Sequence, residues 1–141
     1  MKVMPGAGGF MVRLQRGEEI HEQLTAFARE QGIRGAAVAG VGALEDVEVG
    51  FFNRGARRYD RCLVPEATEL LSLTGNLSLK EGAPFLHAHV VLMRSDFSVA
   101  GGHLFRGRIA ITGEFSVTLT GLSMRREFDD EVGLALLEPH D

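Results

Sequence analysis

The chain has 141 residues, of which 45% are hydrophobic, and this is enough for one domain with a buried core. Its formal charge of −4, from 19 acidic and 15 basic side chains, argues against a protein that binds nucleic acid or anionic membranes through overall positive charge. The single cysteine, Cys62, excludes an intramolecular disulfide.

These limits predict a single domain over residues 1–141. The amino terminus lacks the apolar region of a signal peptide, and no apolar run is long enough to span a membrane. One unpaired cysteine suits a reducing compartment. We therefore expect a cytoplasmic protein with no membrane partner.

The first part of the chain predicts a strand followed by a helix. Residues 10–14 alternate apolar and polar side chains, which is typical of a short strand. In residues 18–31 the apolar side chains recur at spacings of three and four, acids occupy the first turn, and Gly32 follows as a stop signal. This segment is the one main helix that the sequence predicts. His21, on its early turns, is interpreted as a surface or boundary histidine.

The middle of the chain predicts strands. Residues 33–44 are rich in glycine and alanine, which permits close approach of other backbone or of a second subunit. Residues 47–52 and 56–59 then read as a hairpin. Its turn carries the only dense basic cluster, which is either a solvated hairpin tip or a contact for phosphate or an acidic ligand. The cluster consists of Arg54, Arg57, Arg58 and Arg61.

Residues 68–79 predict a longer strand, in which Gly75 indicates a bulge or a close backbone contact. Its period of two places four leucines on one face: Leu71, Leu73, Leu77 and Leu79. Residues 85–93 and 99–105 then predict a second hairpin around a tight turn.

The last part of the chain predicts one more long strand and an ambiguous tail. Residues 108–122 alternate apolar and polar side chains, with a change of phase that indicates a bulge or bend near Gly113. Residues 124–137 fit either a short strand or a helix. The whole pattern predicts a series of strands and one main helix.

The second hairpin contains three of the five histidines. His87 and His89 are two residues apart on one strand, so both point to the same face. A turn centred near Asp96 places His103 opposite His89 on the returning strand. Three imidazoles that converge in this way suit zinc and leave a fourth position for water. The alternative is that His87 and His89 are satisfied by hydrogen bonds in a polar sheet face or subunit interface, while His103 caps a glycine turn.

Several separated motifs give the chain a resemblance to a known family. They are residues 40–44, 69–76, 87–89, 101–104 and 130–134. In this order they resemble the plant and prokaryote conserved (PPC) domain, in its free-standing prokaryotic form. The resemblance covers nearly the whole chain and gives a domain core from about 10 to about 137. It implies an α/β (α+β) fold with a mostly antiparallel sheet, one main helix and assembly as a homotrimer.

In plants the PPC domain accompanies an AT-hook, a basic element that binds the minor groove of DNA, and prokaryotic members are often labelled DNA-binding by this association. Residues 106–109 read Arg-Gly-Arg-Ile, without the proline of an AT-hook, and they lie at the start of a predicted strand. DNA therefore remains a partner expected only from the family.

The PPC fold also resembles that of acetolactate decarboxylase, a zinc enzyme whose His-x-His pair and later histidine hold the metal. This likeness implies zinc at His87, His89 and His103. Glu69 and Glu114 are candidate acids on neighbouring strands, each a general base, a fourth ligand or a solvated residue. Three classes stay open: a metal-binding trimer of unassigned activity, a zinc-dependent lyase or hydrolase acting on a small acid, and a DNA-binding protein.

Overall fold

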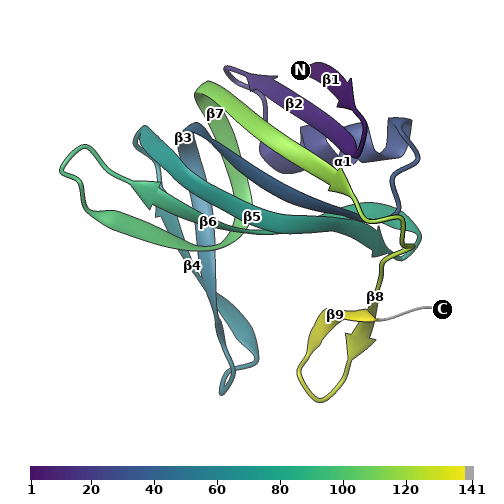
Figure 1. Ribbon diagram of the computed structural model, residues 1–141. Coiled ribbons are helices and arrows are strands. Elements are labelled where there is room, and N and C mark those ends of the chain that lie inside the picture. The colour runs from purple at the N-terminus through teal and green to yellow at the C-terminus, as the bar shows by residue number, and fades with distance from the viewer. Residues whose placement is uncertain (139–141) are drawn as a thin grey trace.

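One strongly curved, mostly antiparallel sheet organises residues 1–138, the part of the chain that the computed structural model describes (Figure 1). The order along the sheet is β1-β2-β7-β3-β5-β8-β9; in addition, β4 pairs with β3, and β6 pairs with both β5 and β7. The elements are β1 (Lys2–Gly6), β2 (Gly9–Gln15), α1 (Ile20–Glu30), β3 (Ala36–Asn53), β4 (Arg58–Val64), β5 (Thr68–Lys80), β6 (Ala83–Met93), β7 (Val99–Leu119), β8 (Arg125–Asp129) and β9 (Leu134–Glu138).

The helix α1 confirms the prediction for residues 18–31 to within two residues at its start and one at its end. Glu19 caps its first turn, because its carboxylate accepts a hydrogen bond of 2.8 Å from the backbone N–H of Glu22. Gly32 follows the helix with a φ of 64°, which glycine adopts without strain. The apolar stripe of the helix packs on the sheet and is formed by Ile20, Leu24, Phe27 and Ala28.

Strands β3 and β7 are the long central strands, and each joins two runs that the sequence pattern separates. β3 has 18 residues and β7 has 21. Their pairing shifts register between Gly42 and Leu44, opposite Gly113 and Ile109, which confirms the bulge predicted near Gly113. The shifts let each strand bend and continue, so that its far end reaches other neighbours.

Strand β5 corrects one detail of the leucine pattern. Its pairing shifts register between Leu70 and Ser72, so the bulge lies at Leu71 and not at Gly75. As a result Leu70 is buried, whereas Leu71 is 45% exposed. The prediction that Leu71 shares the buried face with Leu73 is therefore wrong. Gly75 instead marks the close backbone contact that was the other interpretation of this glycine.

Two hairpins project from the same side of the main sheet, formed by β3–β4 and by β8–β9 (Figure 1). The Arg57 guanidinium, next to the first hairpin turn, donates to the carbonyl of Asp130 in the second. The tail predicted as strand or helix is thus a strand hairpin over the described residues, and β8 joins β5 in parallel. Within residues 1–138, no helix combines the length and apolar character that crossing a bilayer requires.

Candidate metal centre

The three histidines come together on the sheet face opposite the apolar core. On β6, His87 and His89 point to one face while Ala88 and Val90 are buried on the other. His103 on β7 pairs directly with His89, as the hairpin register predicted. His87 and His103 are half-buried and His89 is exposed.

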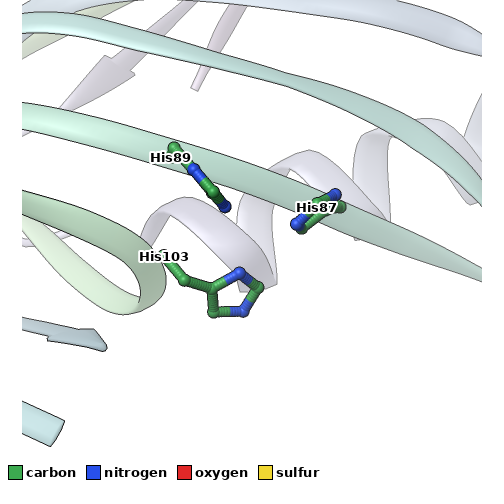
Figure 2. A group of neighbouring side chains, drawn as sticks. All are labelled: His87, His89 and His103. Atoms are coloured by element: carbon green, nitrogen blue, oxygen red, sulfur yellow. The ribbon is translucent and has the colours of Figure 1, made fainter. Parts of the chain in front are cut away.

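The geometry of the cluster is that of three converging ligands. Each histidine offers one ring nitrogen such that all three atoms lie within 4.8 Å of one another. The ring centroids are 5.1 Å apart for His87 and His103, 5.2 Å for His87 and His89, and 5.6 Å for His89 and His103. Figure 2 shows the rings around one common space, with a nitrogen of His103 directed toward the other two.

Glycines in the neighbouring strands allow this convergence. A Cβ on Gly101 would lie 2.3 Å from the Val90 carbonyl oxygen, and one on Gly75 would lie 2.0 Å from the His87 carbonyl oxygen. Both distances are far below van der Waals contact. Only glycine lets β5 and β7 approach β6 this closely, and this approach sets the position of the histidine rings.

Burial keeps two of the imidazoles neutral. It lowers the pKa of His87 to about 4, with further contributions from the positive charge of Arg126 and from His89. Burial also lowers the pKa of His103 to about 4, followed by the effects of His87 and His89. At neutral pH both rings therefore carry the lone pairs that a metal requires.

The Nδ1 atom of His103 is buried and has no hydrogen-bond partner among the described residues. A buried polar atom without a partner costs free energy, and such atoms are uncommon in folded proteins. A metal ion among the three rings would supply the missing partner. The residues of the cluster therefore fit a three-histidine metal site.

Arg126 on β8 is a further site residue, which sequence reasoning missed. Its Nη2 lies 3.1 Å from His87 Nδ1 and donates to the Asn76 side chain at 2.9 Å. Its Nε donates to Ser78 Oγ at 3.0 Å, and its Nη1 donates to the Ala135 carbonyl at 3.2 Å. Arg126 thus connects the histidine cluster to β5 and to the β8–β9 hairpin.

A cavity of about 370 Å³ opens beside the cluster. His87 and His103 form part of its wall, together with Arg126 and Lys80. The remaining lining is aromatic and aliphatic apart from His21, and consists of His21, Tyr59, Phe85, Leu104, Phe105, Leu134, Ala135 and Leu136. A volume of this size is in the range of small-molecule sites.

The candidate acids lie elsewhere. Glu69 is exposed and pairs with Met93, the last residue of β6. Glu114 is exposed and pairs with Arg13 on β2 and with Val41 on β3. Neither lines the histidine cavity. The structure thus brings the three histidines together but does not bring these acids to them.

Most of the other candidate residues have ordinary partners within the chain. The Nε2 of His21 is 3.0 Å from the Leu104 carbonyl oxygen, at the edge of the cavity. In the basic cluster, Arg58 lies 3.7 Å from Asp60, and Arg61 lies 3.4 Å from Glu48. With Arg57 bound to the second hairpin, three of the four arginines have partners within the chain.

Comparison with protein families and solved structures shows which proteins this chain resembles. The model of the Plants and Prokaryotes Conserved (PCC) domain, also abbreviated PPC, matches residues 1–121. The chain belongs to this family. The match ends before β8, so Arg126 lies outside the part of the chain that the PCC model covers. No curated protein sequence matches the chain.

Solved structures of PCC-like proteins match almost the whole chain. A plant- and prokaryote-conserved protein from Pyrococcus horikoshii is 34% identical, with 99% of this chain and 96% of that chain covered and a TM-score of 0.87. A metal-containing protein from Archaeoglobus fulgidus is also 34% identical, with 99% and 100% covered and a TM-score of 0.86. A protein from Bacteroides thetaiotaomicron, named as a proposed DNA-binding protein, is 30% identical, with 97% and 96% covered and a TM-score of 0.93.

Proposed function

We propose that this PCC-domain protein is a homotrimer that binds one zinc ion per chain through His87, His89 and His103. The observation that carries the proposal is the convergence of three imidazole nitrogens within 4.8 Å of one another. The unpartnered Nδ1 of His103 supports it, because a metal would satisfy that atom. The relative from Archaeoglobus fulgidus, named a metal-containing protein, supports it independently.

Zinc is proposed because the donor set consists of imidazoles alone. Imidazole suits zinc and other transition metals, whereas magnesium and calcium prefer oxygen ligands. Three protein ligands leave a fourth tetrahedral position for an exchangeable water. When bound in such a site, zinc supplies Lewis-acid polarisation of a carbonyl group or activation of a water molecule.

Elemental analysis tests the metal site. Protein made without a His-tag is stripped with chelator, reloaded with zinc and desalted. We expect about one zinc per chain in the wild type and in His21→Ala, a matched control outside the cluster. His89→Ala should lose the metal, and since His89 is exposed this variant should still fold. If wild type and His89→Ala retain equally little zinc, the rings are packed imidazoles without a metal.

The homotrimer is supported by the outer face of the sheet. This face carries adjacent apolar side chains on four neighbouring strands: Val41 (52% exposed), Leu71 (45%), Val91 (42%) and Ile111 (71%). An apolar patch across adjacent strands is uncommon on a monomer and typical of a subunit interface. Light scattering at micromolar concentration measures the assembly directly, and a monomer or dimer contradicts the proposal.

A second candidate is a zinc-dependent lyase or hydrolase that acts on a small acid. The cavity of about 370 Å³ beside His87 and His103 favours it, because a bound molecule there would contact the metal ligands. DNA binding has less support. Three arginines of the basic cluster already have partners within the chain, and Arg106 and Arg108 lie within β7 and not in a free basic segment.

A further inference from the structure

Arg126 is a half-buried cation that forms no ion pair with any carboxylate of residues 1–138. Its hydrogen-bond acceptors are an amide, a hydroxyl, a carbonyl and the His87 ring. Charges that are withdrawn from water are normally paired, because neutral acceptors compensate only part of the lost hydration. A permanent cation held in this way next to a cavity indicates an anionic ligand.

The contact between Arg126 and His87 cannot persist when His87 binds a metal as a neutral ligand. Arginine only donates hydrogen bonds, so His87 Nδ1 must be the acceptor and its proton is on Nε2. If a metal takes Nδ1, it displaces Arg126 from that atom. If a metal takes Nε2, the proton moves to Nδ1, and two donors then face each other. In both cases the hydrogen bond from Arg126 is lost.

Loss of this contact gives Arg126 free donors at the wall of the cavity. A guanidinium has five N–H groups, and four are used by Ser78, Ala135, Asn76 and His87. Without the bond to His87, one donor remains on each terminal nitrogen, and a carboxylate accepts two hydrogen bonds from arginine. Metal binding would therefore prepare the anion site.

We propose that Arg126 binds the carboxylate of a small apolar acid in the cavity beside the histidines, and that it does so only after the metal has taken His87. The proposal rests on the zinc site proposed above and gives the class of ligand for it. Arg126 acts here as a binding residue, and its ligand would lie beside His87 and His103, which line the same cavity.

The cavity has the character that such a ligand requires. Its described lining contains two basic side chains, Arg126 and Lys80, and no aspartate or glutamate. Both cations flank the Phe85 ring, with the Lys80 nitrogen 5.3 Å and the Arg126 guanidinium carbon 5.6 Å from its centroid. Aliphatic side chains, Leu134 and Leu136, line the same cavity. A carboxylate on a hydrocarbon body matches a lining that combines cations with apolar side chains.

Calorimetric titration with benzoate tests the proposal, with benzamide as the uncharged probe of the same shape and phenyl phosphate as the phosphate probe. Each is added to the zinc-loaded and to the metal-free protein. The variants are Arg126→Gln, Arg126→Lys and Arg125→Gln, the last being a matched control because Arg125 is the exposed neighbour on the same strand. Circular dichroism checks that each variant is folded, and elemental analysis checks its zinc content.

We expect benzoate to bind the zinc-loaded wild type and Arg125→Gln equally, and to bind Arg126→Gln about 10- to 100-fold more weakly, as loss of a charged hydrogen-bond pair predicts. Arg126→Lys should be intermediate, because it keeps the charge without the planar fork. Benzamide should bind all proteins weakly.

Four results overturn parts of this reasoning in distinguishable ways. Equal benzoate affinity in wild type and Arg126→Gln, both holding zinc, removes Arg126 as the anion site and leaves the metal site intact. Equal affinity in metal-free and zinc-loaded wild type removes the requirement for metal. Tighter binding of phenyl phosphate than of benzoate replaces the carboxylate by a phosphate. Failure of the wild type to take up zinc removes the proposed function itself.

Discussion

The metal-free protein should lose stability in a pH range set by His87 and His103. Both have a pKa of about 4 in the folded chain, against 6.5 for the free side chain. The folded state therefore binds fewer protons than the unfolded state between these values, and the free energy of unfolding falls as pH falls from 6.5 toward 4. Above pH 6.5 both states are neutral at these rings, and the stability is fully present.

The magnitude follows from the two pKa values. At pH 5 the unfolded state is almost fully protonated at each histidine and the folded state is mostly neutral, which corresponds to about 2 kcal/mol for each ring. Both rings keep partial contact with solvent and interact with each other, so we expect about 2 kcal/mol for the pair. Carboxyl groups with lowered pKa, such as Glu18, Glu66 and Asp96, act at lower pH, since their stabilisation is lost only below their ordinary values near 4.

Urea unfolding of chelator-treated protein at pH 8, 6.5 and 5, at one fixed protein concentration, measures this effect. The control is the double variant His87→Gln with His103→Gln, which has no ring to titrate at either position. We expect the wild type to lose about 2 kcal/mol more than this variant between pH 8 and pH 5. An equal loss in both proteins would show that the two rings are not held neutral by the fold, and the assignment of buried neutral ligands would fail.

Two further substitutions test the backbone and the assembly. Gly101→Ala should lower the free energy of unfolding by more than about 2 kcal/mol, because its Cβ meets the Val90 carbonyl oxygen at 2.3 Å. Gly8→Ala, whose Cβ has no neighbour within 4 Å, should change the stability little in a thermal melt. Similar melting temperatures for the two variants would contradict the close approach at Gly101. Ile111→Glu, on the outer face of the sheet, should convert the proposed trimer to monomers in light scattering. Phe128→Glu, on the exposed β8–β9 hairpin, should leave the trimer intact. A trimer that survives Ile111→Glu excludes the outer face of the sheet as the interface.

Local patterns were sufficient for most of the fold. The spacing of apolar side chains predicts the helix, and the alternation of side chains together with the tight turn predicts the histidine hairpin. β1 was missed because every one of its residues, from Lys2 to Gly6, is exposed, so that no apolar alternation marks it. The Leu71 bulge was missed for a related reason: an extra residue changes which parity is buried, and only the pairing with β6 shows where it is inserted.

The histidines could be predicted because their contacts are local. His87 and His89 are two residues apart, and His103 reaches them through one hairpin. Arg126 could not be predicted in this way. It reaches His87 because β8 joins β5 in a short parallel pairing at Leu79 and Lys80, and such a long-range parallel contact leaves no turn or spacing signal in the sequence.

Arg126 also changes what the net charge of the chain implies. A charge of −4 argues against ligands attracted by the whole surface, such as nucleic acid. Inside a cavity with apolar walls, however, nearby charges act over a lower dielectric and are less screened by salt than charges across the surface. Two cations and no described carboxylate line this cavity, so a small anion is favoured there although the protein as a whole repels anions. A large polyanion would not fit a space of about 370 Å³. Global and local charge together therefore favour the proposed small acid over DNA as the ligand of this cavity.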